Sequence, residues 1–140
     1  MKKLSGGAIV LMSLIALTGC GSSSQAEQTL SADCLNIDAA FGNAIMSGAE
    51  SGSGVQFVRA SAVKSPDFNK VFFIAVEFSA TGVSNQVGVF ASNSLTMGEG
   101  TVMAVDAFAQ EFTDWGDADT TKAAISKADP SVATAKACLN

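Results

Sequence analysis

The sequence predicts one α+β domain in which a three-stranded antiparallel meander is packed by helices on one face, in the order α-β-β-β-α-α. Three observations support this class. The 140 residues suit a single domain. The middle of the chain alternates apolar and polar residues as strands do, and the segments on either side repeat with the period of a helix. We therefore expect helices before and after a central sheet.

The first helix is expected over residues 31–47. Ser31 or Asp33 would cap its first turn. Residues 47–54 are rich in Gly and Ser, so they should end the helix in a loop. The apolar residues that recur at the spacing of one helix face are Ile37, Phe41, Ala44, Ile45 and Gly48.

Three strands are expected over residues 55–63, 71–79 and 86–92. Short connections that contain Pro, Asp and Gly separate them, as tight turns between antiparallel strands require. The second strand alternates most clearly, because successive side chains of a strand point to opposite faces. Its even-numbered face, which must be buried, carries Phe72, Ile74, Val76 and Phe78.

Two further helices are expected toward the end of the chain. The second helix would run from Thr101 to a stop at Gly116, and residues 120–127 would add a short helical segment. Asp129 and Pro130 predict the N-cap and first position of the last helix. The stripe of the second helix is Val102, Val105, Phe108, Ala109, Phe112 and Trp115, and the last helix would turn Val132, Ala135, Cys138 and Leu139 inward.

The first twenty residues have the pattern of an export signal. Lys2 and Lys3 precede an apolar run over residues 8–17. Ten residues at about 1.5 Å each cover roughly half of a ~30 Å hydrocarbon core, so the run is too short to span a membrane. The run ends in Leu17-Thr18-Gly19-Cys20, which resembles the lipobox of bacterial lipoproteins.

This resemblance implies how the protein is processed and held. Residues 1–19 would be removed as a signal peptide, and the thiol of Cys20 would carry the lipid that anchors the chain in the membrane. Residues 20–30 would be the lipidated Cys and a flexible linker, and residues 31–140 the single folded domain. Gly21 is not the Asp that retains many lipoproteins at the inner membrane, so the resemblance implies an outward-facing envelope protein, at the outer membrane in a Gram-negative cell.

The remaining two of the three Cys residues predict a disulfide between Cys34 and Cys138. Such a bridge would join the first helix to the last. Two free buried thiols, or a reactive or metal-binding Cys, are the alternatives. The close Cys-x-x-Cys spacing of a redox motif is absent.

Composition excludes several classes of function. The chain has no His, which excludes Ser-His-Asp and Cys-His catalysis and His-ligated zinc or haem. Eight basic and 13 acidic residues give a formal charge of −5, the wrong sign for binding nucleic acid. Residues 98–101 lack the Lys and the spacing of a phosphate loop, so we interpret them as a turn. We expect no cofactor.

Two groups of residues are candidates for binding. Acidic side chains gather around the expected end of the second helix and form either a weak cation site or a solvated acidic loop; they are Glu111, Asp114, Asp117 and Asp119. Aromatic and Met side chains either line a ligand or partner surface or pack in the core; they are Phe90, Met97, Met103 and Trp115.

The sequence therefore predicts a membrane-anchored, non-enzymatic binding or accessory domain at the cell envelope, with a protein or another envelope component as its partner. The alternative is a small-ligand carrier or an enzyme that uses carboxylates alone. The residues for that alternative are Glu77, Glu111 and Asp114. It requires a concave apolar pocket in which two of the three converge.

Overall fold

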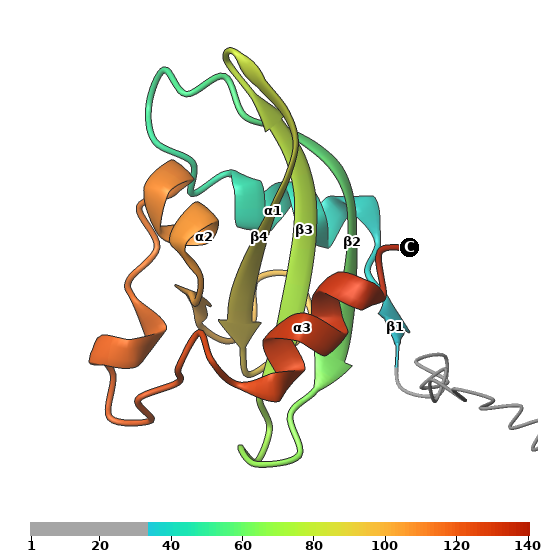
Figure 1. Ribbon diagram of the computed structural model, residues 1–140, viewed down its shortest axis with the longest axis vertical. Helices are drawn as coiled ribbons and strands as arrows, with labels where there is room; N and C mark the ends of the chain where they lie inside the picture. Colours follow the sequence, from blue (N-terminus) through green and yellow to red (C-terminus); the bar gives the residue numbers. More distant parts are fainter. Residues whose placement is uncertain (1–33) are drawn as a thin grey trace, which may run out of the picture.

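The computed structural model describes residues 34–140, which form an antiparallel five-stranded sheet with helices on both of its faces (Figure 1). The strands lie in the sheet in the same order as in the chain. They are β1 (Leu35–Asn36), β2 (Gln56–Lys64), β3 (Phe72–Ala80), β4 (Val83–Ser92) and β5 (Val102–Ala104). The α+β class and the central meander β2-β3-β4 are thus confirmed. The prediction of three strands is wrong, because the short edge strands β1 and β5 bring the sheet to five.

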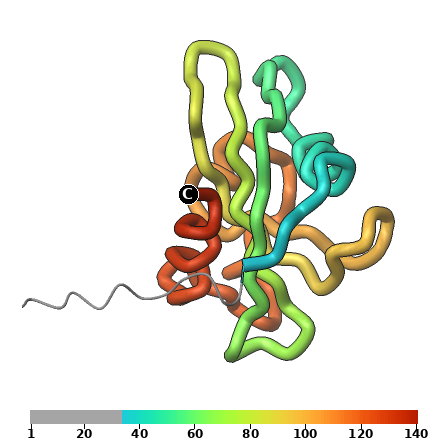
Figure 2. The backbone as a smooth tube through the Cα atoms, turned by 90° about the vertical axis from the view of Figure 1, so that its right-hand side faces the viewer, coloured from blue at the N-terminus to red at the C-terminus, as the bar shows by residue number. Residues whose placement is uncertain are grey.

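Four helical segments accompany the sheet: α1 (Ala39–Met46), α2 (Ala107–Phe112), the short 3-10 helix η1 (Ala118–Thr120) and α3 (Pro130–Ala137). Seen along the sheet, α3 lies on one side and α1 on the other (Figure 2). The prediction of helices on one face only is therefore wrong.

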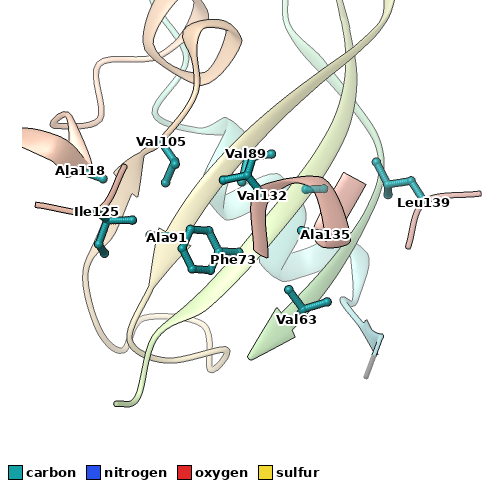
Figure 3. Close-up of a cluster of buried hydrophobic side chains, with 11 residues drawn as sticks. Val63, Phe73, Val89, Ala91, Val105, Ala118, Ile125, Val132, Ala135 and Leu139 are labelled. Carbon is teal, nitrogen blue, oxygen red and sulfur yellow. The ribbon is translucent and has the colours of Figure 1, made fainter. Parts of the chain in front are cut away.

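The side chains of β3 explain this two-sided arrangement. Phe73 and Ala75 belong to a buried cluster beneath α3, together with Val89 of β4 and Val132 of α3 (Figure 3). The even-numbered residues of β3 belong to the opposite cluster, as predicted; they are Ile74, Val76 and Phe78, with Phe72 packed at its margin. An apolar residue at nearly every position is typical of a strand buried on both faces.

Strand β1 stands where the first helix was expected to begin. Leu35 and Asn36 pair with Ala62 and Ser61 of β2. Helix α1 starts only at Ala39 because the Asp38 side chain caps it. The cap residue is therefore neither Ser31 nor Asp33, both of which lie outside the described residues.

Strand β5 replaces the first turn of the expected second helix. Residues 102–104 pair with Phe90, Ala91 and Ser92 of β4, and α2 begins at Ala107 with Asp106 as its N-cap. The spacing of Val102 and Val105 suits a helix face, but Asp106 is favourable at a cap and unfavourable inside a helix. Helix α2 also ends before Gly116, because Thr113 is extended.

The last helix begins as predicted. Oδ1 of Asp129 accepts a hydrogen bond of 2.8 Å from the Ser131 amide, and Pro130 occupies the first turn. Three of the four inward positions are buried: Val132, Ala135 and Leu139. The helical segment expected over residues 120–127 is absent, and only η1 precedes a series of turns there.

A disulfide joins Cys34 and Cys138 with a Cα–Cα distance of 5.7 Å, across 104 residues of chain. The predicted pairing is confirmed. It connects the residue before β1 to the residue after α3, however, so it does not join two helices as expected. No helix within residues 34–140 is long and apolar enough to cross a membrane. The predicted signal peptide, lipobox and linker fall outside the described residues.

Candidate functional site

A groove of about 370 Å³ lies between α1 and the turn that precedes β5. This volume falls within the usual range of ligand sites. Both walls are on the α1 side of the sheet, where the turn projects beside α1 (Figure 2). We call it the Trp115 groove, and its lining residues are Phe41, Ala44, Ile45, Gly98, Glu99, Gly100, Thr101, Val102 and Trp115.

Helix α1 supplies the apolar wall. Phe41, Ala44 and Ile45 share one side of the helix, as their spacing predicted. Phe41 and Ile45 also anchor the helix in the core, because both are buried. Ala44 is half-buried and has a small side chain, so it leaves open space above the sheet.

Trp115 lines the groove and is hydrogen-bonded to α1. Its indole Nε1 donates a hydrogen bond of 2.7 Å to the backbone oxygen of Ile45. The ring packs so closely over Gly48 that a Cβ at that position would overlap it. The Asp114 amide adds a hydrogen bond of 2.8 Å to the Gly48 oxygen. The indole is therefore held in place before any ligand arrives.

The opposite wall is the turn at residues 98–101, and the sequence interpretation of a turn is confirmed. Gly98 and Gly100 adopt φ values of 80° and 79°, which side-chain-bearing residues rarely tolerate. Oδ1 of Asn93 accepts a hydrogen bond of 2.8 Å from the Thr101 amide and closes the turn. This wall is thus shaped by backbone geometry and is exposed to solvent.

The groove lining and the segment over residues 98–115 carry only acidic charged residues. Glu99 is the one charged residue in the lining, and it forms no ion pair with any residue of the range 34–140. Residues 71–121 contain seven acidic residues and no Lys or Arg. Two of the seven are neutralised: Glu77 by Arg59 and Asp106 by Lys136. The other five are exposed.

Comparison with family models, curated proteins and solved structures finds no match for this chain.

The four aromatic and Met candidates do not form one surface. Trp115 lines the groove, and Met97 is exposed in the turn beside it. Phe90 is fully buried in the core. Met103 lines a second cavity of about 150 Å³, together with Val71 and Ile125. Val71 and Ile125 belong to the cluster beneath α3, so this cavity lies toward the other face of the sheet.

The acidic candidates are not brought together. Glu111, Asp114, Asp117 and Asp119 are all exposed. Within residues 34–140, no three acidic or Cys side chains lie close enough to hold a metal ion. The structure thus places these residues as separate charges on the surface.

The three carboxylates of the alternative function lie outside both cavities. Glu77 pairs with Arg59 on the neighbouring strand. Glu111 and Asp114 are exposed, and none of the three lines the Trp115 groove or the second cavity.

Sequence reasoning missed two parts of the site. It treated residues 98–101 only as a connection, because nothing in the sequence indicates that this turn lies opposite Phe41. It also missed that the indole ring of Trp115 packs directly against Gly48. A Gly at a helix position on the apolar face was the available signal, since such a residue allows close packing.

Proposed function

We propose that the chain is a lipid-anchored, non-enzymatic binding domain of a bacterial cell envelope, and that the Trp115 groove is its binding surface. The observation that carries this proposal is the groove itself. It combines two aromatic residues, an apolar helix face and a single carboxylate in one open cavity, which is the usual composition of a recognition site.

The groove suits binding better than catalysis. The side chains in its lining that can take part in proton transfer or nucleophilic attack are Glu99 and Thr101. The chain has no His to activate a hydroxyl group. The hydrogen bond between Trp115 and Ile45 holds the aromatic wall in place. A preformed site loses little entropy when it binds a partner.

The sequence and the disulfide support the location. The lipobox resemblance at Leu17-Thr18-Gly19-Cys20 implies removal of residues 1–19 and lipidation of Cys20. The Cys34–Cys138 disulfide fits an oxidising compartment outside the cytoplasm. A linker of about ten residues reaches roughly 30 Å when extended, which leaves the groove accessible to partners near the membrane.

In-cell crosslinking followed by affinity capture and mass spectrometry tests the groove. We would compare the native protein with Ala44→Phe, which fills the groove, and Ala133→Phe, which adds the same ring at an exposed site on α3. We expect a specific partner with the native protein and with Ala133→Phe, and its loss with Ala44→Phe. Retention of that partner by a folded Ala44→Phe protein would contradict the proposal.

A Cys20→Ala protein tests the anchor separately. We expect the native protein in the membrane fraction, with a mass that shows acylated Cys20 as its first residue. The Cys20→Ala protein should lack the acyl mass and keep the signal segment. Identical masses and fractions for the two proteins, apart from the substituted atoms, would contradict lipid anchoring.

A further inference from the structure

We infer that the occupant of the Trp115 groove is a basic segment of a partner polypeptide, with a Lys or Arg side chain lying against Trp115 and its charged head near Glu99. This inference rests on the proposed binding function and specifies the chemistry of the ligand. Three features support it: the shape and polarity of the lining, the position of its one charge, and the distribution of charge over the domain.

The lining matches a long side chain that is apolar along its stem and cationic at its tip. The half-buried Ala44 and Val102 offer apolar surface for methylene groups, which Lys and Arg bury readily while their heads remain polar. Trp115 offers an indole, the ring that attracts cations most strongly. The Nε1–H group of Trp115 already donates a hydrogen bond to the backbone oxygen of Ile45, so it is not available to bind a ligand.

Glu99 supplies the charge that would select a cation. It is the charged residue of the lining and lies in the exposed turn. With no ion pair inside the described domain, its carboxylate is available to a partner. An anionic ligand would be repelled by this group, and an uncharged ligand would gain a hydrogen bond from it but no ion pair.

The wider charge distribution has the same sign. Two further acidic residues next to groove elements are exposed. Asp38 is the N-cap of α1, the helix that carries Phe41, and Asp114 directly precedes Trp115. None of the domain's six basic residues lines the groove. Arg59 and Lys136 are in ion pairs, and the other four are Lys64, Lys70, Lys122 and Lys127. A cationic segment would therefore be attracted from a distance, while anionic lipid would be repelled.

Trp115 fluorescence provides the test, because the chain has a single Trp. The full chain, purified from membranes in an uncharged detergent, would be titrated with a blocked octapeptide that alternates Lys and Ala. The same peptide with acetylated Lys side chains keeps the length and removes the charge. We expect a saturable emission change with the first peptide that weakens as salt is added, and at least fivefold weaker binding of the second.

Glu99→Gln and Glu111→Gln form a matched pair of variants, since each removes one exposed carboxylate and only Glu99 lines the groove. We expect roughly threefold to fivefold weaker binding with Glu99→Gln, and a change below about twofold with Glu111→Gln. Equal effects of the two variants would overturn the inference, because the attraction would then come from net charge alone.

The outcomes separate this inference from the proposed function. Equal binding of both peptides, abolished by Ala44→Phe, would overturn the basic ligand and leave the groove as a binding site. Binding of the Lys peptide that is unaffected by Ala44→Phe would overturn both. No response to either peptide would overturn the inference, and the groove proposal would then depend on the capture experiment.

Discussion

Asp106 and Lys136 connect the beginning of α2 to α3 at the edge of the sheet. Oδ2 of Asp106 lies 2.7 Å from Nζ of Lys136, and Oδ1 accepts hydrogen bonds of 3.0 and 3.1 Å from the amides of Val89 and Ala109. Lys136 is the only polar partner of the buried Oδ2 among the described residues. One carboxylate thus holds β4, α2 and α3 together.

We predict that Asp106→Ala destabilises the domain by about 2 to 3 kcal/mol, because two buried amides lose their acceptor and α2 loses its cap. Urea unfolding measures the change. Asp106→Asn keeps a side-chain oxygen for the amides and should cost clearly less. A loss below about 1 kcal/mol for Asp106→Ala would contradict this role.

Phe73→Ala tests the two-sided core. Phe73 is fully buried beneath α3, on the face of β3 that the sequence prediction left open to solvent. Removal of a buried Phe side chain costs about 3 to 5 kcal/mol, so we expect a loss of that size by thermal or urea unfolding. Phe78→Ala, which removes a Phe from the opposite face, serves as the comparison. A negligible effect of Phe73→Ala would show that α3 does not cover this face.

Reduction of the Cys34–Cys138 disulfide should lower the free energy of unfolding by about 4 to 5 kcal/mol, because the intact bridge closes a loop of 104 residues in the unfolded chain. The Cys34→Ser, Cys138→Ser double variant should unfold at the same urea concentration as the reduced native domain, whether or not reductant is present. Alkylation of both residues in the denatured, unreduced protein would contradict the bridge.

Gly48→Ala should disturb the groove, because a Cβ at residue 48 would overlap the indole of Trp115. We expect a shift of Trp115 emission and destabilisation of about 1 to 3 kcal/mol from overpacking. Gly116→Ala is the matched control, since a Cβ at residue 116 meets no atom within 4 Å. If the two variants gave identical emission and stability, the packing of Trp115 on Gly48 would be wrong.

The sequence predicted the parts of the fold that depend on local patterns. The alternation around Phe72–Phe78 identified the central strand, Asp129-Pro130 identified the start of α3, and the count of Cys residues identified the bridge. Strands β1 and β5 could not be predicted, because two or three residues have no measurable period and become strands only by pairing with β2 and β4.

The candidate site was predictable only in its separate pieces. The apolar face of α1 followed from spacing, and Trp115 was recognised as either a surface or a core residue. The contact between α1 and Trp115 depends on the close packing of the indole against Gly48. It also depends on the hydrogen bond from Nε1 of Trp115 to the Ile45 oxygen, which joins residues 70 positions apart in the chain. Contacts of that separation arise from tertiary packing, which no local pattern specifies.

The most direct test of the groove as the binding surface is photo-crosslinking in living cells from a single photoreactive residue. Placed at position 97, the probe replaces the exposed Met97 in the turn beside the groove and leaves the groove open, and placed at position 133 it lies on the exposed side of α3. A discrete crosslinked partner from position 97, absent from position 133 and weakened by Glu99→Gln, is the predicted result. The same partner from both positions, or from position 133 alone, would contradict it.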